Sequence, residues 1–230
     1  MSLFIIEGID GSGKTTQAEI LVKKLNDDGY DTLRIKFPNY NDRAAGPIKM
    51  YLEGEFGTDP EAVNAYAAST FYAIDRYASY KKIWENAYKS GVVIISDRYV
   101  MSNIIHQSSK LKLDERKVYF DWLYDFEYVK LGLPKPDRSF FLDVPPILSL
   151  KQVEKRYNGD EGKKDIHERD FNYLKKCYEA GIYACEYLDI KRIECVKDGK
   201  IKDIDEINNI IYDNIIKIIK VQKDSYNKIT

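Results

Sequence analysis

The 230-residue sequence has little of what marks several common classes of protein. It contains three cysteines, an odd number without CxxC spacing, so neither a disulfide framework nor a zinc site is indicated, and we expect buried thiols. It has no excess of charge, with 36 Lys and Arg against 37 Asp and Glu, so no overall field favours nucleic acid or an anionic membrane. The first apolar run, residues 3–6, is too short for a signal peptide or a membrane span. We therefore expect a soluble, cytoplasmic protein that binds neither nucleic acid nor membranes.

Short apolar runs alternate with helix-like stretches along the chain. The candidate strands are residues 3–6, 31–37, 92–96, 139–144 and 192–196. The candidate helices are residues 15–28, 59–89, 98–109, 114–131, a stretch from 145 onward, and 203–222. The second of these helices should start at Asp59, as the N-cap, with Pro60 in the first turn. Strands separated by helices form βαβ units, so we predict one α/β domain over residues 1–230, with a five-stranded parallel sheet covered on both faces.

The strongest motif is GIDGSGKT at residues 8–15, which matches GxxxxGK[ST] at every fixed position. It follows a candidate strand and opens a candidate helix, the context in which this loop binds nucleotide phosphates such as those of ATP. Its glycines let backbone N–H groups converge on a phosphate, Lys14 can reach the outer phosphates, and Thr15 can offer a hydroxyl to Mg²⁺. The alternative is a glycine-rich turn with an exposed lysine. The predicted phosphate-binding residues are Gly8, Ile9, Asp10, Gly11, Ser12, Gly13, Lys14, Thr15 and Thr16.

Polar segments follow two further candidate strands. FPNY (37–40) follows the second strand, and Asp97 and Arg98 end the third. Ligands of doubly wound sheets bind at the carboxyl ends of the strands, so both segments should face the phosphate loop. Asp97 could position Mg²⁺, whereas Arg98 is better explained by a second anion, such as the phosphate of an acceptor. The alternative is that Asp97 and Arg98 merely cap the following helix.

Two pairs of side chains share helix faces near these segments. Tyr72 and Arg76 are four residues apart, so the ring could stack on a flat base while the guanidinium bonds its edge. Asn103 and His106 are three apart, and the Asn amide could pair with the imide of a base because it both donates and accepts. Without further context, ordinary packing is the more common explanation for Tyr72 and Arg76, and a helix-surface amide is the more common one for Asn103.

Taken together, these segments resemble the thymidylate kinases, in particular the bacterial enzymes with FPxY and DRYxxSN motifs. The matching segments are GIDGSGKTTQ (8–17), FPNY (37–40), TFYAIDR (70–76), DRYVMSN (97–103), LGLPKPD (131–137) and DIHERD (165–170). The resemblance covers residues 1 to about 180 and implies a P-loop nucleoside monophosphate kinase fold with a short lid at about residues 154–170. It also implies that a homodimer phosphorylates dTMP to dTDP with ATP and Mg²⁺.

The resemblance assigns roles to individual residues. The catalytic group would be Lys14, Arg98, Asp10 and Arg156, with Lys155, Lys163 and Lys164 as other candidates for the lid cation. The dTMP-binding group would be Asp10, Phe37, Tyr40, Tyr72, Arg76, Arg98, Ser102, Asn103, His106, Gln107, Asp165, His167 and Glu168. The Mg²⁺ ligands would be drawn from Thr15, Asp10, Asp97 and Glu168.

The chain departs from the family pattern at three places. His106 stands where these enzymes usually carry a Tyr near the deoxyribose, which puts discrimination against a 2′-hydroxyl in doubt. His167 likewise replaces a lid Tyr, and both histidines could also be ordinary surface residues. The phosphate loop carries Asp10-Gly11-Ser12 where some members have an Arg, so the missing positive charge is expected to come from the lid.

Three other functions compete with this reading. A GTPase-like switch would need a guanine-reading NKxD motif after the fourth strand, where this chain has LDVPP (142–146). A deoxynucleoside kinase would need a carboxylate base near the second strand, and FPNY offers none. Other nucleoside monophosphate kinases, acting on dUMP or a purine nucleotide, remain open.

Overall fold

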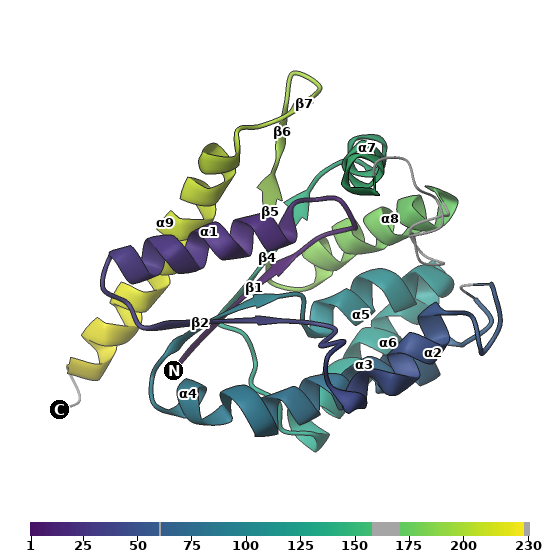
Figure 1. Ribbon diagram of the computed structural model, residues 1–230, viewed down its shortest axis with the longest axis horizontal. Coiled ribbons are helices and arrows are strands. Elements are labelled where there is room, and N and C mark those ends of the chain that lie inside the picture. Colours follow the sequence, from purple (N-terminus) through teal and green to yellow (C-terminus); the bar gives the residue numbers. More distant parts are fainter. Residues whose placement is uncertain (60, 158–170, 228–230) are drawn as a thin grey trace.

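The structure is a computed structural model that describes residues 1–59, 61–157 and 171–227 (Figure 1). Its central sheet has five parallel strands in the order β2-β3-β1-β4-β5. In chain order they are β1 (Ser2–Glu7), β2 (Thr32–Lys36), β3 (Val93–Asp97), β4 (Arg138–Asp143) and β5 (Ile190–Glu194). The α/β fold with a parallel sheet, predicted from the alternation of apolar runs and helical stretches, is confirmed.

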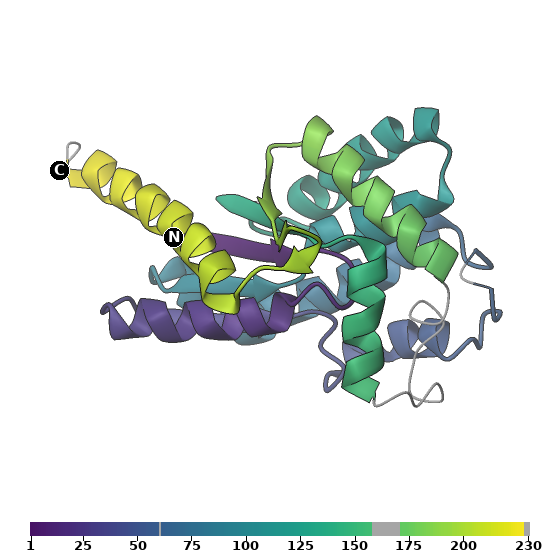
Figure 2. The same cartoon turned by 90° about the horizontal axis from the view of Figure 1, so that it is seen from above.

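Helices cover both faces of this sheet (Figures 1 and 2). One face carries α1 (Lys14–Asp27) and α9 (Ile204–Asn227). The other carries α3 (Ala65–Ser79), α5 (Val100–Gln107), α6 (Leu113–Tyr124) and α8 (Phe171–Tyr187). The remaining helical segments are α2 (Gly46–Leu52), α4 (Glu85–Lys89), α7 (Pro146–Tyr157), and the short η1 (Arg43–Ala45), η2 (Tyr80–Trp84), η3 (Ser108–Lys110) and η4 (Asp125–Lys130). No helix in the described ranges is long and apolar enough to cross a membrane.

Strand β1 shows why both faces must be covered. Its side chains alternate: Leu3 and Ile5 belong to the core that includes α5, α6 and α8, whereas Phe4 and Ile6 belong to the core under α1 and α9. All four are fully buried. Helix α9 completes the second core with an isoleucine on each turn, at Ile207, Ile211, Ile215 and Ile219. Each such side chain contributes about 1.5–3 kcal/mol on burial, so the continuous apolar strand requires helices on both sides.

The helix predicted to start at Asp59 starts later. Its N-cap is Asn64, whose side chain accepts a hydrogen bond from the Ala67 N–H at 2.9 Å. The Asp59 carboxylate instead accepts the N–H of Glu61 at 2.8 Å, closing a local turn. Asp and Asn support a turn and a helix cap by the same hydrogen bond, which is why the sequence alone placed the start wrongly.

Some elements were not predicted. Helices α2 and α8 escaped notice, and the turn expected at residues 197–199 closes a small antiparallel hairpin of β6 (Val196–Lys197) and β7 (Lys200–Ile201). Asp198 and Gly199 both have positive φ, 49° and 72°, as tight hairpin turns require. The predicted lid falls almost wholly in residues 158–170, outside the described ranges.

The amino end of the sheet is fastened to α9 by a carboxylate. Asp137 accepts the N–H of Leu3 at 2.8 Å and the amide N–H of Gln222 at 2.6 Å, while the Ser2 hydroxyl donates to the Gln222 oxygen at 2.9 Å. This contact lies at the end of β1 opposite to the phosphate loop. It therefore bears on stability and not on ligand binding.

The three thiols are expected to react slowly in the native protein. Burial raises the pKa of Cys177, Cys185 and Cys195 to about 12 each, so only about one thiol in ten thousand is ionised at pH 8. A colorimetric thiol reagent should release colour quickly only after denaturation. Cys177 and Cys195 are buried as expected, whereas Cys185 is half-buried. A native protein in which all three thiols react quickly would contradict this prediction.

Candidate active site

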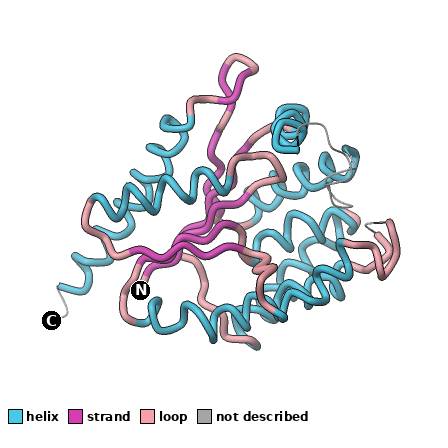
Figure 3. Tube along the Cα trace, viewed as in Figure 1, coloured by secondary structure: helices cyan, strands magenta, loops and turns pink. Residues whose placement is uncertain are grey.

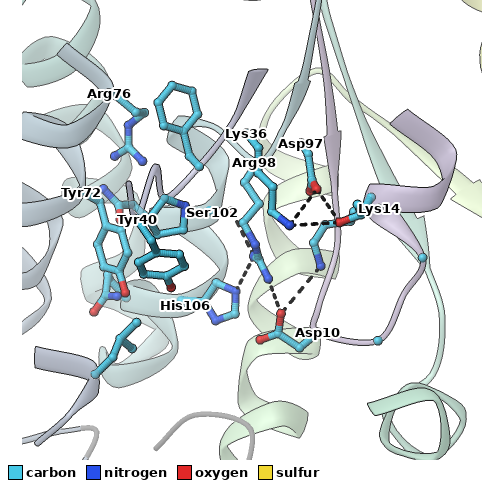
Figure 4. A pocket seen from close by; sticks show the side chains of 18 of the residues that line it. Asp10, Lys14, Lys36, Tyr40, Tyr72, Arg76, Asp97, Arg98, Ser102 and His106 are labelled. Atoms are coloured by element: carbon cyan, nitrogen blue, oxygen red, sulfur yellow. Dashed lines mark hydrogen bonds and ion pairs between the residues drawn. The ribbon is translucent and has the colours of Figure 1, made fainter. Parts of the chain in front are cut away.

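The carboxyl ends of the strands surround one cavity of about 530 Å³ (Figure 4). Its lining includes most of the site residues predicted from the sequence, namely Asp10, Gly11, Gly13, Lys14, Thr15, Thr16, Phe37, Tyr40, Tyr72, Arg76, Asp97, Arg98, Ser102, Asn103, His106 and Gln107. Gly8, Ile9 and Ser12 belong to the same loop but do not line the cavity. The parallel sheet brings these segments together because every strand ends at the same edge, as Figure 3 shows for the loops that leave it.

The phosphate loop is shaped by its glycines and braced by α7. Gly11 has φ of 80°, and a Cβ there would collide with the carbonyl oxygen of Ser149. The Ser149 hydroxyl donates in turn to the Asp10 carbonyl oxygen. These contacts show why Gly11 cannot be exchanged: the turn requires a positive φ and α7 leaves no room for a side chain.

Lys14 lies folded over this loop. Its ammonium donates to the Ile9 carbonyl oxygen at 2.8 Å and lies 3.8 Å from an Asp10 carboxylate oxygen. Burial lowers the pKa of Lys14 to about 8, assisted by the nearby Arg98 guanidinium and opposed by Asp10. The side chain is buried, not exposed as the alternative reading of the motif required.

Thr15, Asp97 and Lys36 meet at the entrance to α1. The Thr15 hydroxyl donates to Asp97 Oδ2 at 2.6 Å, and the Lys36 ammonium lies 3.7 Å from the same oxygen and 3.4 Å from the hydroxyl. The register of β2 and β3 pairs Lys36 with Asp97 directly. A hydroxyl and a carboxylate oxygen are hard donors of the kind Mg²⁺ takes, so Thr15 and Asp97 fit that ion.

Arg98 is held by its backbone conformation and by several contacts of its side chain. It adopts φ of 71°, in the left-handed region, which costs a non-glycine residue about 1–2 kcal/mol. Its guanidinium pairs with Asp10, donates to the Ser102 hydroxyl at 3.2 Å, and contacts His106 Nε2 at 3.1 Å. Burial alone would lower the pKa of Arg98, but the carboxylates of Asp10 and Glu7 more than offset it and raise the pKa. The guanidinium is therefore a permanent cation facing the cavity.

His106 is buried between α5 and α8, which excludes the plain surface reading. Arg98 can only donate, so Nε2 of His106 accepts and the ring proton resides on Nδ1, 3.5 Å from the Cys177 sulfur. The ring also stacks on Tyr173, with centroids 6.4 Å apart. The imidazole thus supports Arg98, while its role near a sugar remains a prediction.

The far end of the cavity carries the groups expected to meet a base. Arg76 is almost fully buried and donates through Nε and Nη2 to both oxygens of Glu127, each at 2.6 Å, and through Nη1 to the Tyr99 carbonyl oxygen at 3.3 Å. The Asn103 amide donates to Glu127 and to the Ser69 carbonyl oxygen, both at 3.3 Å. Burial raises the pKa of Glu127 and the Arg76 charge opposes this.

Gln107 is a further polar group at this end of the cavity. Its side chain is fully buried, and neither its amide oxygen nor its amide nitrogen has a hydrogen-bond partner among the described residues. Buried amides are almost always satisfied, so the cavity offers an unmet donor and acceptor to a ligand.

The structure adds residues that the sequence reasoning missed. They are Glu7, which accepts a hydrogen bond from the Ser102 hydroxyl beside Arg98, Lys36, which lies near Asp97, and Glu127, which pairs with Arg76. Lys36 could have been found, since it ends a strand immediately before FPNY. Glu7 and Glu127 gave no local signal. The side chain of Arg156 and the whole of Lys163, Lys164, Asp165, His167 and Glu168 lie outside the described residues, while Lys155 is exposed on α7.

The chain is similar in sequence to known proteins of one family. The family model described as thymidylate kinase matches residues 6–198. Thymidylate kinase of Mycobacterium tuberculosis H37Rv is 34% identical over 170 residues, 73% of this chain and 78% of that protein. A probable thymidylate kinase of Pyrococcus horikoshii is 33% identical over 174 residues, 74% and 80% of the two chains. Thymidylate kinase of Plasmodium falciparum is 26% identical over 226 residues, 97% and 93% of the two. The chain therefore belongs to the thymidylate kinase family.

Proposed function

We propose that this protein transfers the γ-phosphoryl group of ATP to dTMP, giving dTDP and ADP. The observation that supports this proposal is that two separate cationic groups line one cavity. Lys14 lies at the phosphate loop, and Arg98 follows the neighbouring strand. Each would bind one anion. A donor phosphate and an acceptor phosphate would then face each other with the cavity between them.

The reaction asks the protein mainly for positioning and for positive charge, because charge spreads over the migrating group between two anions. Lys14 stabilises that charge on the donor side, and Arg98 holds the acceptor phosphate in line. No general base is needed, since an acceptor phosphate oxygen is already ionised at neutral pH. Tyr72, Arg76, Asn103 and Gln107 line the end of the cavity that would take the thymine ring.

We further propose that Mg²⁺ accompanies ATP. Thr15 and Asp97 would hold it, and when bound it would supply positive charge that offsets the negative charge of the phosphates. The Lys36 ammonium lies close to Asp97 Oδ2 and to the Thr15 hydroxyl, so it would have to move away when the ion binds. Of the other two predicted ligands, Asp10 is paired with Arg98, and Glu168 lies outside the described residues.

A homodimer is proposed on the apolar surface of α3 and α6. Tyr66, Ile74 and Tyr77 are 38%, 51% and 41% exposed along one side of α3. Tyr66 makes an edge contact with Trp122 of α6, which stacks on Phe126. A partly exposed aromatic surface of this kind is typical of subunit interfaces.

We place the protein in the cytoplasm, since its three cysteines are free thiols, as in a reducing compartment.

The acceptor can be identified by measuring ADP release with ATP and Mg²⁺ and one candidate acceptor at a time. We expect turnover with dTMP, and little with thymidine, which lacks the anion that Arg98 would bind. Parallel reactions with dUMP, GMP and the ribonucleotide of thymine report the selectivity for base and sugar. Strong turnover of thymidine with none of dTMP would refute the proposed function.

A further inference from the structure

We infer that Glu7 is a positioning residue that fixes Arg98 in the orientation that binds the acceptor phosphate, an inference that rests on the proposed function. Glu7 is the last residue of β1 and is fully buried. It does not line the cavity, so it acts through other groups and does not touch the ligand. Neither the motif nor the predicted site residues include it.

The first part of the argument concerns the backbone. Arg98 has φ of 71°, which L-residues adopt rarely, so its neighbours must impose it. The Arg98 N–H donates to the Ile6 carbonyl oxygen at 3.1 Å, and the Ser96 hydroxyl donates to the Arg98 carbonyl oxygen at 2.6 Å. The next N–H, of Tyr99, donates to Glu7 Oε1 at 2.7 Å. Glu7 therefore holds the peptide group that directly follows the unusual residue.

The second part concerns the side chain. The Arg98 guanidinium donates to the Ser102 hydroxyl at 3.2 Å, and that hydroxyl donates to Glu7 Oε2 at 2.8 Å. One carboxylate thus orients both the main chain of Arg98, through Tyr99, and its side chain, through Ser102. The hydroxyl can serve both bonds because it accepts from the cation and donates to the anion.

Glu7 differs from the other carboxylate at Arg98. Asp10 pairs with the guanidinium directly, lines the cavity and keeps 20% of its side chain exposed. An arriving phosphate would compete with Asp10 for the same N–H groups and repel its charge. Glu7 would keep its hydrogen bonds to the Tyr99 N–H and the Ser102 hydroxyl during this exchange, because it lies outside the cavity lining. The cation would stay in place when its partner in the cavity changes.

The test compares dissociation constants for dTMP and thymidine, measured by calorimetry on the full chain. Glu7→Gln keeps the shape but removes the charge and one of the two accepting oxygens. We expect dTMP to bind about 10- to 100-fold more weakly, as when an orienting partner of a ligating residue is lost. Thymidine carries no phosphate, so its dissociation constant should stay at the wild-type value. A purely structural role for Glu7 would weaken both ligands alike.

Two further variants complete the design. Asp137→Asn makes the same chemical change in a carboxylate that accepts a backbone N–H at the other end of β1, and it should leave both constants unchanged. In an Arg98→Ala background, Glu7→Gln should add no further loss of dTMP affinity. If Glu7→Gln does not fold, Ser102→Ala breaks the same connection and should again weaken dTMP more than thymidine.

The outcomes separate this inference from the proposed function. Unchanged dTMP affinity in Glu7→Gln, or an additional loss in the Arg98→Ala background, would overturn the role of Glu7. A wild-type protein that turns over dTMP while Glu7→Gln binds both ligands normally would refute the inference alone. A wild-type protein that does not phosphorylate dTMP would refute the proposed function.

Discussion

Lys14→Met should slow phosphoryl transfer to dTMP by about 10²- to 10³-fold, the usual cost of removing one preorganised group from the charge that develops in the transition state. The Lys14 ammonium already lies over the phosphate loop, 2.8 Å from the Ile9 carbonyl oxygen, so it needs little rearrangement to meet a phosphate. The change should appear mainly in kcat at saturating ATP and dTMP. It is measured by the same ADP-release reaction.

This loss should not come from unfolding. Burial lowers the pKa of Lys14 to about 8, which means that the charged amine disfavours the folded state at pH 7, and the neutral methionine removes that cost. The thermal midpoint of Lys14→Met should therefore equal or exceed that of the wild type. Lys23→Met, at an exposed position of the same helix, is the matched control and should keep full activity. Normal turnover by Lys14→Met would remove Lys14 from the mechanism.

Glu127→Leu should lower the free energy of unfolding by about 3–5 kcal/mol, the typical result of leaving a buried ion without its partner. Arg76 is 1% exposed and gives two of its donors to Glu127, which is itself fully buried. Without the carboxylate, the buried Arg76 guanidinium loses its ion partner and keeps only its bond to the Tyr99 carbonyl oxygen. Urea denaturation of the wild type and the variant measures the difference.

The double variant Arg76→Met/Glu127→Leu tests whether the cost belongs to the pair or to the position. Replacing both ions by apolar side chains of similar size is often neutral, so the double variant should be more stable than either single one. It should still lose dTMP affinity, since Arg76 would no longer meet the base. A double variant as unstable as the sum of its parts would show that packing, and not the unpaired charge, sets the cost.

Several features of this protein could be predicted from local patterns. The phosphate loop was found because strand, glycine loop and helix follow each other without interruption, although the contacts that brace it come from the distant Ser149. Asp97 and Arg98 were found by a general rule, that parallel strands end at one edge, and the cavity does lie there. The start of α3 was predicted wrongly because a turn, as at Asp59, and a helix cap, as at Asn64, both use a side-chain oxygen that accepts a nearby backbone N–H.

The partners of the site residues could not be predicted in this way. Glu7 meets Ser102, and Glu127 meets Arg76, across separations of 95 and 51 residues. Nothing in the sequence around either glutamate distinguishes it from the other acidic residues, because what makes it special is burial beside a particular cation. His106 was recognised as a departure, but its contacts with Arg98 and Cys177 depend on how α5 packs on α8.

The sequence by itself determined the fold class, the phosphate loop and the family resemblance, because apolar periodicity and contiguous motifs act over short stretches of chain. Only the tertiary structure decided how the charges are arranged. The packing of helices against the sheet brought Glu7 to Ser102 beside Arg98 and paired Asp10 with the Arg98 guanidinium. It also paired Glu127 with Arg76. The physical reason is that desolvation makes every buried charge depend on its neighbours in space, and those neighbours are distant in the sequence.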